Sequence, residues 1–167
     1  MVIWLIGISG AGKTTLGNKI HKYFIKKKIN SFIIDGDIVR EFYNNDLGYG
    51  IDDRIANIKR IMLSVYVLEK NNIIPIVCNI SPFEELRDFA RHKFSSYHEI
   101  YLHKKLNFAK KNDVKGVYKN NLNKTALVGV DLNFDEPKKS NLTINVDTES
   151  EEESYMKIIN YINKINS

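Results

Sequence analysis

The chain has 167 residues, a hydrophobic content of 43% and a formal net charge of +5. This length allows one sizeable core and no composition break marks a boundary, so we expect a single domain over residues 1–167. No apolar stretch approaches the roughly 20 residues that cross a bilayer, and the first apolar run is too short for a secretory leader, so the expected location is the cytoplasm. The positive charge suits nucleic acids and small anions equally, so it excludes neither.

Residues 1–28 predict a strand, a phosphate-binding loop and a helix. The apolar run 2–6 leads directly into Gly-Ile-Ser-Gly-Ala-Gly-Lys-Thr-Thr, which fills the pattern G-x-x-x-x-G-K-[ST]. A helix over 14–28 would then aim its N-terminus and the loop N–H groups at phosphate oxygens. The alternative is a glycine-rich turn that binds nothing, and the ordered strand, loop and helix disfavour it. The sequence therefore predicts a protein that binds ATP or GTP.

Individual roles within this loop follow from the chemistry of the side chains. Lys13 would reach the β- and γ-phosphates, and the Thr14 hydroxyl would ligate Mg²⁺. The predicted nucleotide contacts are Gly7, Ser9, Gly10, Ala11, Gly12, Lys13, Thr14 and Thr15.

The rest of the chain alternates between strands and helices. Further strands are expected at 31–35, 73–80, 99–103 and 142–146, and helices at 51–70, 82–94, from about 105, and at 149–165. Ser81 is the expected N-cap of helix 82–94, with Pro82 at its first position. The pattern predicts an α/β fold, the three-layer P-loop NTPase fold, with a mostly parallel five-stranded sheet and helices on both faces. Ligands of such a sheet bind at the carboxyl ends of its strands.

Charged side chains follow the second predicted strand. Asp35 and Asp37 end that strand, Arg40 comes one helical turn later, and Arg54 and Asn57 open the long helix. A carboxylate beside a transferring phosphoryl group can accept the proton of an attacking hydroxyl or hold Mg²⁺. Arginines offer forked donors to phosphate or sulfate. Either aspartate could instead cap a following helix, but for the pair the acid–base interpretation is favoured.

Taken in order, several segments resemble one family, the adenylylsulfate (APS) kinases. These are small phosphate-loop enzymes that phosphorylate the ribose 3′-hydroxyl of adenylylsulfate. The segments are residues 7–15, Asp-Gly-Asp-Ile-Val-Arg at 35–40, Asp-Leu-Gly-Tyr at 46–49, Asp-Arg-Ile-Ala-Asn-Ile-Lys-Arg at 53–60, Ile-Ser-Pro at 80–82 and Lys-Gly-Val-Tyr-Lys at 115–119. The resemblance runs over nearly the whole chain and implies a kinase that uses ATP and Mg²⁺. It makes Asp37 the base near the 3′-hydroxyl, with Lys13 as a further catalytic residue and Asp35 a helper at the metal.

The resemblance also assigns an acceptor site. Arg40, Arg54 and Asn57 would hold the anionic end of the acceptor, and Tyr49 stands where the family has an aromatic that stacks on its base. Ser81 occupies the position of a serine that the family offers to the acceptor, sometimes described as phosphorylated. Members of the family are often dimers, so the resemblance allows a homodimer.

The predicted lid, residues 105–130, carries the departures from the family. Lys115 would lie over both substrates, as in the family. Asn112 replaces the arginine that lies near the ATP adenine, and Leu127 replaces the phenylalanine that closes on the acceptor base. A leucine covers a base but cannot stack on it. A changed acceptor, cytidine diphosphoramidate of bacterial capsule pathways, is therefore our first hypothesis, with adenylylsulfate as the alternative.

Two rival classes can be compared with these expectations. A nucleotide-gated binding protein that reads guanine would carry Asn-Lys-x-Asp, whereas Asn123 and Lys124 are followed by Thr-Ala. A nucleic-acid kinase would need aromatics within a basic groove, whereas Lys104 and its neighbours look like a solvated face. No nucleic-acid or membrane partner is expected. The lone Cys78 is interpreted as a core thiol, and the four histidines lack metal-ligand spacing.

Overall fold

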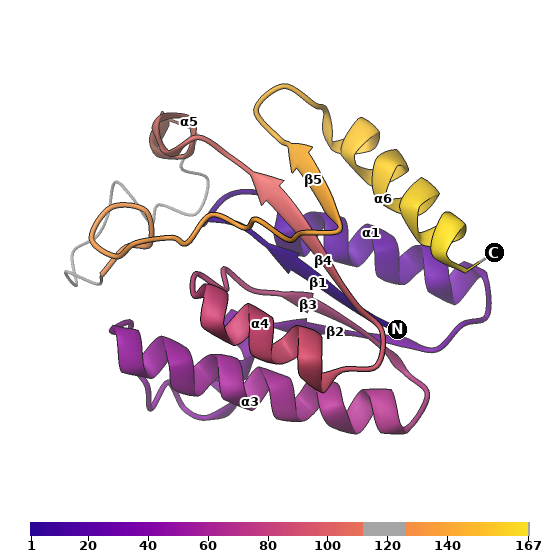
Figure 1. Ribbon diagram of the computed structural model, residues 1–167, viewed down its shortest axis with the longest axis horizontal. Coiled ribbons are helices and arrows are strands. Elements are labelled where there is room, and N and C mark those ends of the chain that lie inside the picture. Colours follow the sequence, from indigo (N-terminus) through magenta and orange to yellow (C-terminus); the bar gives the residue numbers. More distant parts are fainter. Residues whose placement is uncertain (112–125, 167) are drawn as a thin grey trace.

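The computed structural model describes residues 1–111 and 126–166, and five strands in it form a single sheet (Figure 1). The strands lie in the order β2-β3-β1-β4-β5, and all four neighbouring pairs run parallel. Their bounds are β1 Val2–Ile6, β2 Ser31–Asp35, β3 Ile74–Cys78, β4 Tyr97–His103 and β5 Leu142–Asn145. The predicted α/β architecture is thus confirmed, and the parallel sheet brings the carboxyl ends of all five strands to one edge.

Helices cover both faces of the sheet. Figure 1 shows α1 (Lys13–Lys26) and α6 (Glu151–Ile165) on one face, and α3 (Ile51–Lys70) and α4 (Glu84–Lys93) on the other. Successive strand side chains point to opposite faces, so the central strand β1 contributes to both cores. Its Ile3 and Leu5 pack in the cluster with α1 and α6, and its Val2, Trp4 and Ile6 pack in the cluster with α3 and α4.

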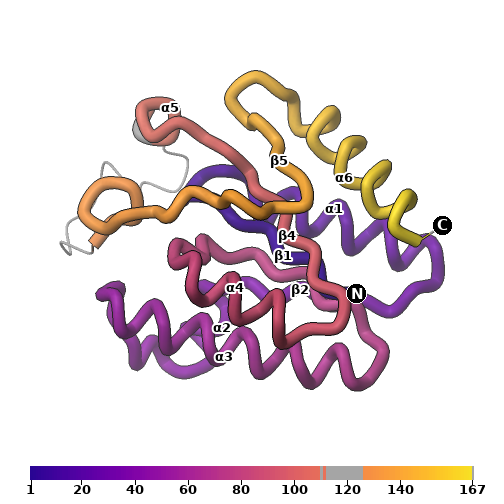
Figure 2. Tube along the Cα trace, viewed as in Figure 1, coloured from indigo at the N-terminus to yellow at the C-terminus, as the bar shows by residue number. Residues whose placement is uncertain are grey.

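Two shorter helices follow the carboxyl ends of strands. The first, α2 (Gly36–Phe42), begins directly after β2 and lies beside α3 (Figure 2). Asp35 is its N-cap, because the Asp35 side chain accepts a hydrogen bond from the Asp37 N–H. The alternative interpretation of Asp35 as a cap is therefore correct. The second, α5 (Leu106–Lys111), follows β4 where a basic helix was expected.

The expectation that Ser81 caps a helix starting at Pro82 is wrong. The helix begins at Glu84, with Phe83 as an N-cap that makes no side-chain hydrogen bond. Instead the Glu84 N–H donates to Asp135 Oδ2 at 3.1 Å, so a carboxylate far along the chain caps α4. Ser81 itself has φ 48° and is buried.

The lone cysteine lies at the end of β3 against α1. Cys78 is buried, its Sγ donates to the Lys13 carbonyl at 3.3 Å, and burial raises its pKa to about 12. A Cβ on Gly17 of α1 would lie 2.4 Å from this sulfur, so α1 packs against β3 more closely than any side chain allows. The thiol is an inert core group, as predicted. None of the helices in the described ranges is long and apolar enough to span a membrane.

Candidate active site

The phosphate loop joins β1 to α1 at the carboxyl edge of the sheet. Gly12 is the N-cap of α1 with φ 87°, and no side chain caps the first turn of this helix. Gly7 has φ 147°, and a Cβ there would lie 2.6 Å from the Leu102 carbonyl oxygen. These two positions therefore require glycine, one for its left-handed backbone and one for its close approach to β4. The uncapped N–H groups of α1 are suited to phosphate oxygens.

Two lysines place their ammonium groups on this loop. Lys13 Nζ donates to the carbonyls of Gly7 and Ile8 at 2.8 and 2.9 Å. Lys104 Nζ donates to the Gly10 carbonyl at 2.9 Å. The interpretation of Lys104 as part of a solvated face is incomplete, because its ammonium group contacts the loop. Its position directly after β4 was the signal that could have found it.

Thr14 and Asp35 form the predicted metal-binding pair. Thr14 Oγ1 donates to Asp35 Oδ2 at 2.7 Å, while Asp35 Oδ1 accepts from the Asp37 N–H at 2.9 Å. Within residues 1–111 and 126–166, no three His, Cys, Asp or Glu side chains gather as a metal site. A Mg²⁺ ion here would take its remaining ligands from nucleotide phosphates and water, which is how Mg²⁺ is usually held beside ATP. The hydroxyl and carboxylate fit that ion.

Asp37 has a different environment from Asp35. Asp35 is buried, whereas Asp37 is exposed in the first turn of α2. The Asp37 carboxylate also raises the pKa of Arg54, so the two charges lie within electrostatic reach, although burial and the nearby Arg40 together keep that pKa below its usual value. Of these two carboxylates, Asp37 is therefore the solvent-exposed one.

Two buried arginines lie together near Asp37. The guanidinium groups of Arg40 and Arg54 lie over the Tyr49 ring, 4.6 and 5.5 Å from its centroid. Arg40 donates to the carbonyls of Leu47 and Gly48, and Arg54 to those of Tyr49 and Ala126. Within the described part of the chain, neither arginine pairs with a carboxylate. Two neighbouring buried cations that form no ion pair with the described residues are suited to bind an anionic group.

Asn57 and Ser81 complete this side of the site in the structure. Asn57 is 3% exposed and donates from Nδ2 to the Gly36 carbonyl, while its buried Oδ1 has no hydrogen-bond partner among the described residues. Ser81 is 2% exposed, and its hydroxyl oxygen accepts from Trp4 Nε1 at 2.9 Å. Asn57 therefore has an acceptor atom to offer, whereas the Ser81 hydroxyl oxygen already accepts one hydrogen bond.

The chain returns to the site at residues 126–135, which we call the return segment. Ala126 accepts from Arg54, so its neighbour Leu127 lies next to the arginine pair. The Leu127 carbonyl accepts from the N–H groups of residues 130–132 in a tight turn. Leu127 is thus brought to the acceptor side, whereas Asn112 and Lys115 lie outside the described residues.

The fold and this loop define a phosphate-loop kinase, and the buried arginine pair lies within electrostatic reach of Asp37 as a second cationic group. The sequence model of the family described as adenylylsulphate kinase matches residues 1–145. The chain belongs to this family. Kinases of this family are ATP-dependent nucleotide 3′-phosphotransferases that use Mg²⁺, and the Thr14–Asp35 pair fits such an ion.

Individual relatives are similar over almost the whole chain. An adenylyl-sulfate kinase of Rippkaea orientalis is 34% identical over 160 residues, which are 95% of this chain and 88% of that protein. One from Bacillus pumilus is 33% identical and covers 96% and 84%. The structure of a Mycobacterium tuberculosis APS kinase in complex with AMPPNP and APS has a TM-score of 0.89 at 26% identity, and covers 97% of this chain and 96% of that one.

Proposed function

We propose that this kinase transfers the γ-phosphoryl group of ATP to the ribose 3′-hydroxyl of adenylylsulfate. The observation that carries the proposal is the buried pair Arg40–Arg54, which forms no ion pair at hydrogen-bond distance among the described residues and lies within electrostatic reach of the exposed carboxylate of Asp37. Such a pair suits the phosphosulfate end of adenylylsulfate. The relatives support the same acceptor, because those cited above are adenylyl-sulfate kinases and one was solved with APS bound.

The proposed chemistry is an in-line transfer. Asp37 accepts the proton of the 3′-hydroxyl as its oxygen bonds to the γ-phosphorus, and the bond from that phosphorus to the β-bridging oxygen breaks to release ADP. Lys13 and the loop N–H groups stabilise the charge that develops on the phosphates. Mg²⁺, held by Thr14 and Asp35, would supply further positive charge at those oxygens.

The acceptor would be held at both ends in this proposal. Arg40, Arg54 and Asn57 bind its anionic end, and Tyr49 is the group that contacts its base. The Ser81 hydroxyl oxygen already accepts from Trp4, so Ser81 would offer the acceptor its O–H as a donor. We also propose that a lid of residues 105–130 covers the substrates, with Lys115 over both of them and Asn112 near the ATP adenine.

Cytidine diphosphoramidate is the competing acceptor. Leu127 is the feature that favours it, since a pyrimidine needs less stacking area than adenine. The comparisons with relatives give that preference no support. The two compounds share a ribonucleoside 5′-phosphate that carries a second tetrahedral group, so the arginines alone do not distinguish them.

The test is a comparison of kcat/KM for the two acceptors, measured by ADP release with ATP and Mg²⁺. The proposal predicts a clear preference for adenylylsulfate. A preference for cytidine diphosphoramidate would show that the proposed acceptor is wrong, while the proposed transfer mechanism would still apply. ATP binding without transfer to either compound would favour a nucleotide-gated binding protein.

A further inference from the structure

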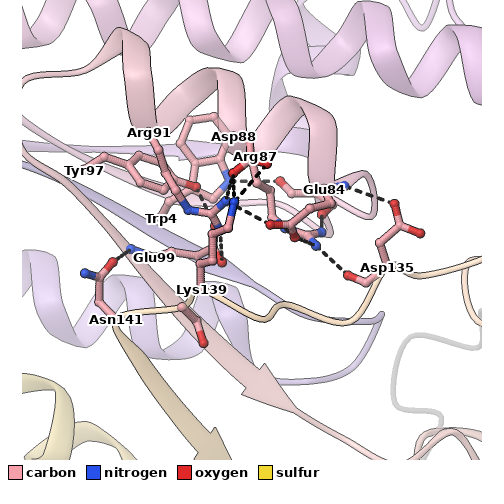
Figure 3. Close-up of polar contacts among 12 residues, drawn as sticks. Trp4, Glu84, Arg87, Asp88, Arg91, Tyr97, Glu99, Asp135, Lys139 and Asn141 are labelled. Atoms are coloured by element: carbon pink, nitrogen blue, oxygen red, sulfur yellow. Dashed lines mark hydrogen bonds and ion pairs between the residues drawn. The ribbon is translucent and has the colours of Figure 1, made fainter.

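Arg87 of α4 is a buried cation outside the site described above. It is 2% exposed, and its guanidinium group donates in several directions (Figure 3). Nη1 donates to the Ser81 carbonyl at 2.7 Å and Nη2 to the Asp135 carbonyl at 2.6 Å. Nε and Nη2 also donate to Glu84 one turn earlier. One side chain therefore joins the loop after β3 to the end of the return segment.

Asp135 strengthens the same connection. Its N–H donates to the Pro82 carbonyl at 2.9 Å, and its Oδ2 accepts from the Glu84 N–H at 3.1 Å. The neighbouring Phe134 ring lies under the Arg87 guanidinium, 5.9 Å from centroid to Cζ, and stacks on Tyr101 of β4 at 5.9 Å. The return segment is thus fixed at residues 134–135 by α4 and β4, and touches Arg54 at its other end through Ala126.

The N–H, the hydroxyl oxygen and the carbonyl of Ser81 each take part in a hydrogen bond. Its N–H donates to Asn79 Oδ1 at 3.1 Å, its Oγ accepts from Trp4, and its carbonyl accepts from Arg87. These three bonds hold a non-glycine residue at φ 48°, a conformation that persists only where the surroundings fix it. Without the Arg87 bond, Ser81 would lose one of the three contacts that fix its backbone.

We propose that Arg87 is a positioning residue for the acceptor: through its bonds to the Ser81 and Asp135 carbonyls it fixes the Ser81 backbone and the return segment against Arg54. The assignment of the acceptor end rests on the proposed function.

Arg91 of the same helix provides a matched control. Figure 3 shows it beside Arg87, and it also bonds to Glu84, but its other partners are Asp88 and Glu99. Glu99 is fully buried in β4, whereas the Arg91 side chain is 17% exposed, so Arg91 is a partly buried arginine on the same helix. None of the bonds recorded for Arg91 within the described part of the chain reaches Ser81 or the return segment.

The experiment compares Arg87→Lys with Arg91→Lys by steady-state kinetics and melting temperature. We expect Arg87→Lys to raise the KM for adenylylsulfate about tenfold or more and to leave the KM for ATP within about twofold, because a misplacement of the acceptor is costly. Arg91→Lys should leave both KM values near wild type, whatever it does to the melting temperature. Equal changes in both KM values, an unchanged acceptor KM, or the same acceptor effect from Arg91→Lys would overturn the proposal. If Arg87→Lys does not fold, Arg87→Gln is the second variant, with the same split expected, because it removes bonds to the Ser81 and Asp135 carbonyls.

Tryptophan fluorescence tests the positioning role of Arg87 without any catalytic turnover, and so independently of the proposed function. Trp4 is the single tryptophan of the chain and donates to Ser81 Oγ, so its emission reports the position of that residue. Arg87→Lys should change the emission and Arg91→Lys should not. If the wild type fails to phosphorylate adenylylsulfate, the proposed function falls. The emission comparison then decides the positioning role, and unchanged emission in Arg87→Lys overturns it.

Discussion

The phosphate loop is formed by consecutive residues between one strand and one helix, whereas the acceptor side takes its side chains from α2, α3, the loop after β3 and the return segment. The loop relies mainly on its backbone, with Gly7 and Gly12 in positions that only glycine fills easily. The acceptor side relies on buried charged and amide side chains whose partners lie far apart in the chain. The first can therefore be recognised in sequence as a motif, and the second exists only when the fold is complete.

The largest effect should come from the loop side. Lys13→Ala removes the ammonium group that lies on the loop, so we expect kcat/KM for ATP to fall about 10³-fold, with loss of nucleotide affinity. Steady-state kinetics and nucleotide titration would measure both. Lys19→Ala is the control, because Lys19 lies on the same helix but pairs at the surface with Glu151. Activity within tenfold of wild type would show that Lys13 does not serve the phosphates.

Asp37→Asn tests the point where the two sides meet. Since the amide cannot take the hydroxyl proton, kcat should fall by about 10² to 10⁴ while ATP affinity stays near wild type. Single-turnover transfer and an ATP titration measure the two quantities. Asp52→Asn, an exposed aspartate in the first turn of α3, should behave as wild type. A variant at position 37 that kept most of its kcat would remove the assignment of the base.

Arg54→Lys addresses the acceptor side alone. It keeps one positive charge but loses the forked bonds to the carbonyls of Tyr49 and Ala126, so the KM for the acceptor should rise about tenfold. The KM for ATP should not change. Arg60→Lys is the control, because Arg60 pairs with Asp46 nearer the surface. An equal rise in both KM values would argue against two separately built sides.

Gly17→Ala is expected to act on stability. The added Cβ would meet Cys78 Sγ, so the free energy of unfolding should fall by about 1–3 kcal/mol. Urea unfolding measures it. In a Cys78→Ala background the same change should cost less, because the sulfur is gone. An equal loss of unfolding free energy in both backgrounds would show that the Cys78 sulfur is not what makes Gly17→Ala destabilising.

The smallest effect belongs to His98, away from both sides of the site. Burial lowers its pKa below the ordinary value, and its ring nitrogens bond to Tyr161 and Ser96. The unfolded chain binds the proton more readily, so His98 contributes stability above about pH 6.5 that is lost as the pH falls through its lower folded pKa. Urea unfolding at pH 7 and pH 5 should show a smaller pH dependence for His98→Gln. If the pH dependence of the unfolding free energy were the same in His98→Gln as in the wild type, other titrating groups would be its source.

Much of the fold could be predicted because hydrophobic runs, glycines and helix caps act locally. All five strands, the loop and the long helix α3 lie within two residues of their expected bounds. The start of α4 could not be predicted, since Asp135 caps it from a distant segment and Ser81 instead bonds to Trp4. The contact of Arg87 with the Ser81 carbonyl was missed because it exists only in the folded chain, whereas Lys104 could have been noticed from its position directly after β4. Asn112 and Lys115 stay predictions.

The most direct test of the central claim is to identify the product by phosphorus NMR after incubation with ATP, Mg²⁺ and adenylylsulfate. The account predicts a new phosphomonoester whose phosphorus couples to the ribose H3′ of adenylylsulfate, formed in equal amount with ADP. Coupling to another ribose proton, or ADP accompanied only by inorganic phosphate, would contradict it.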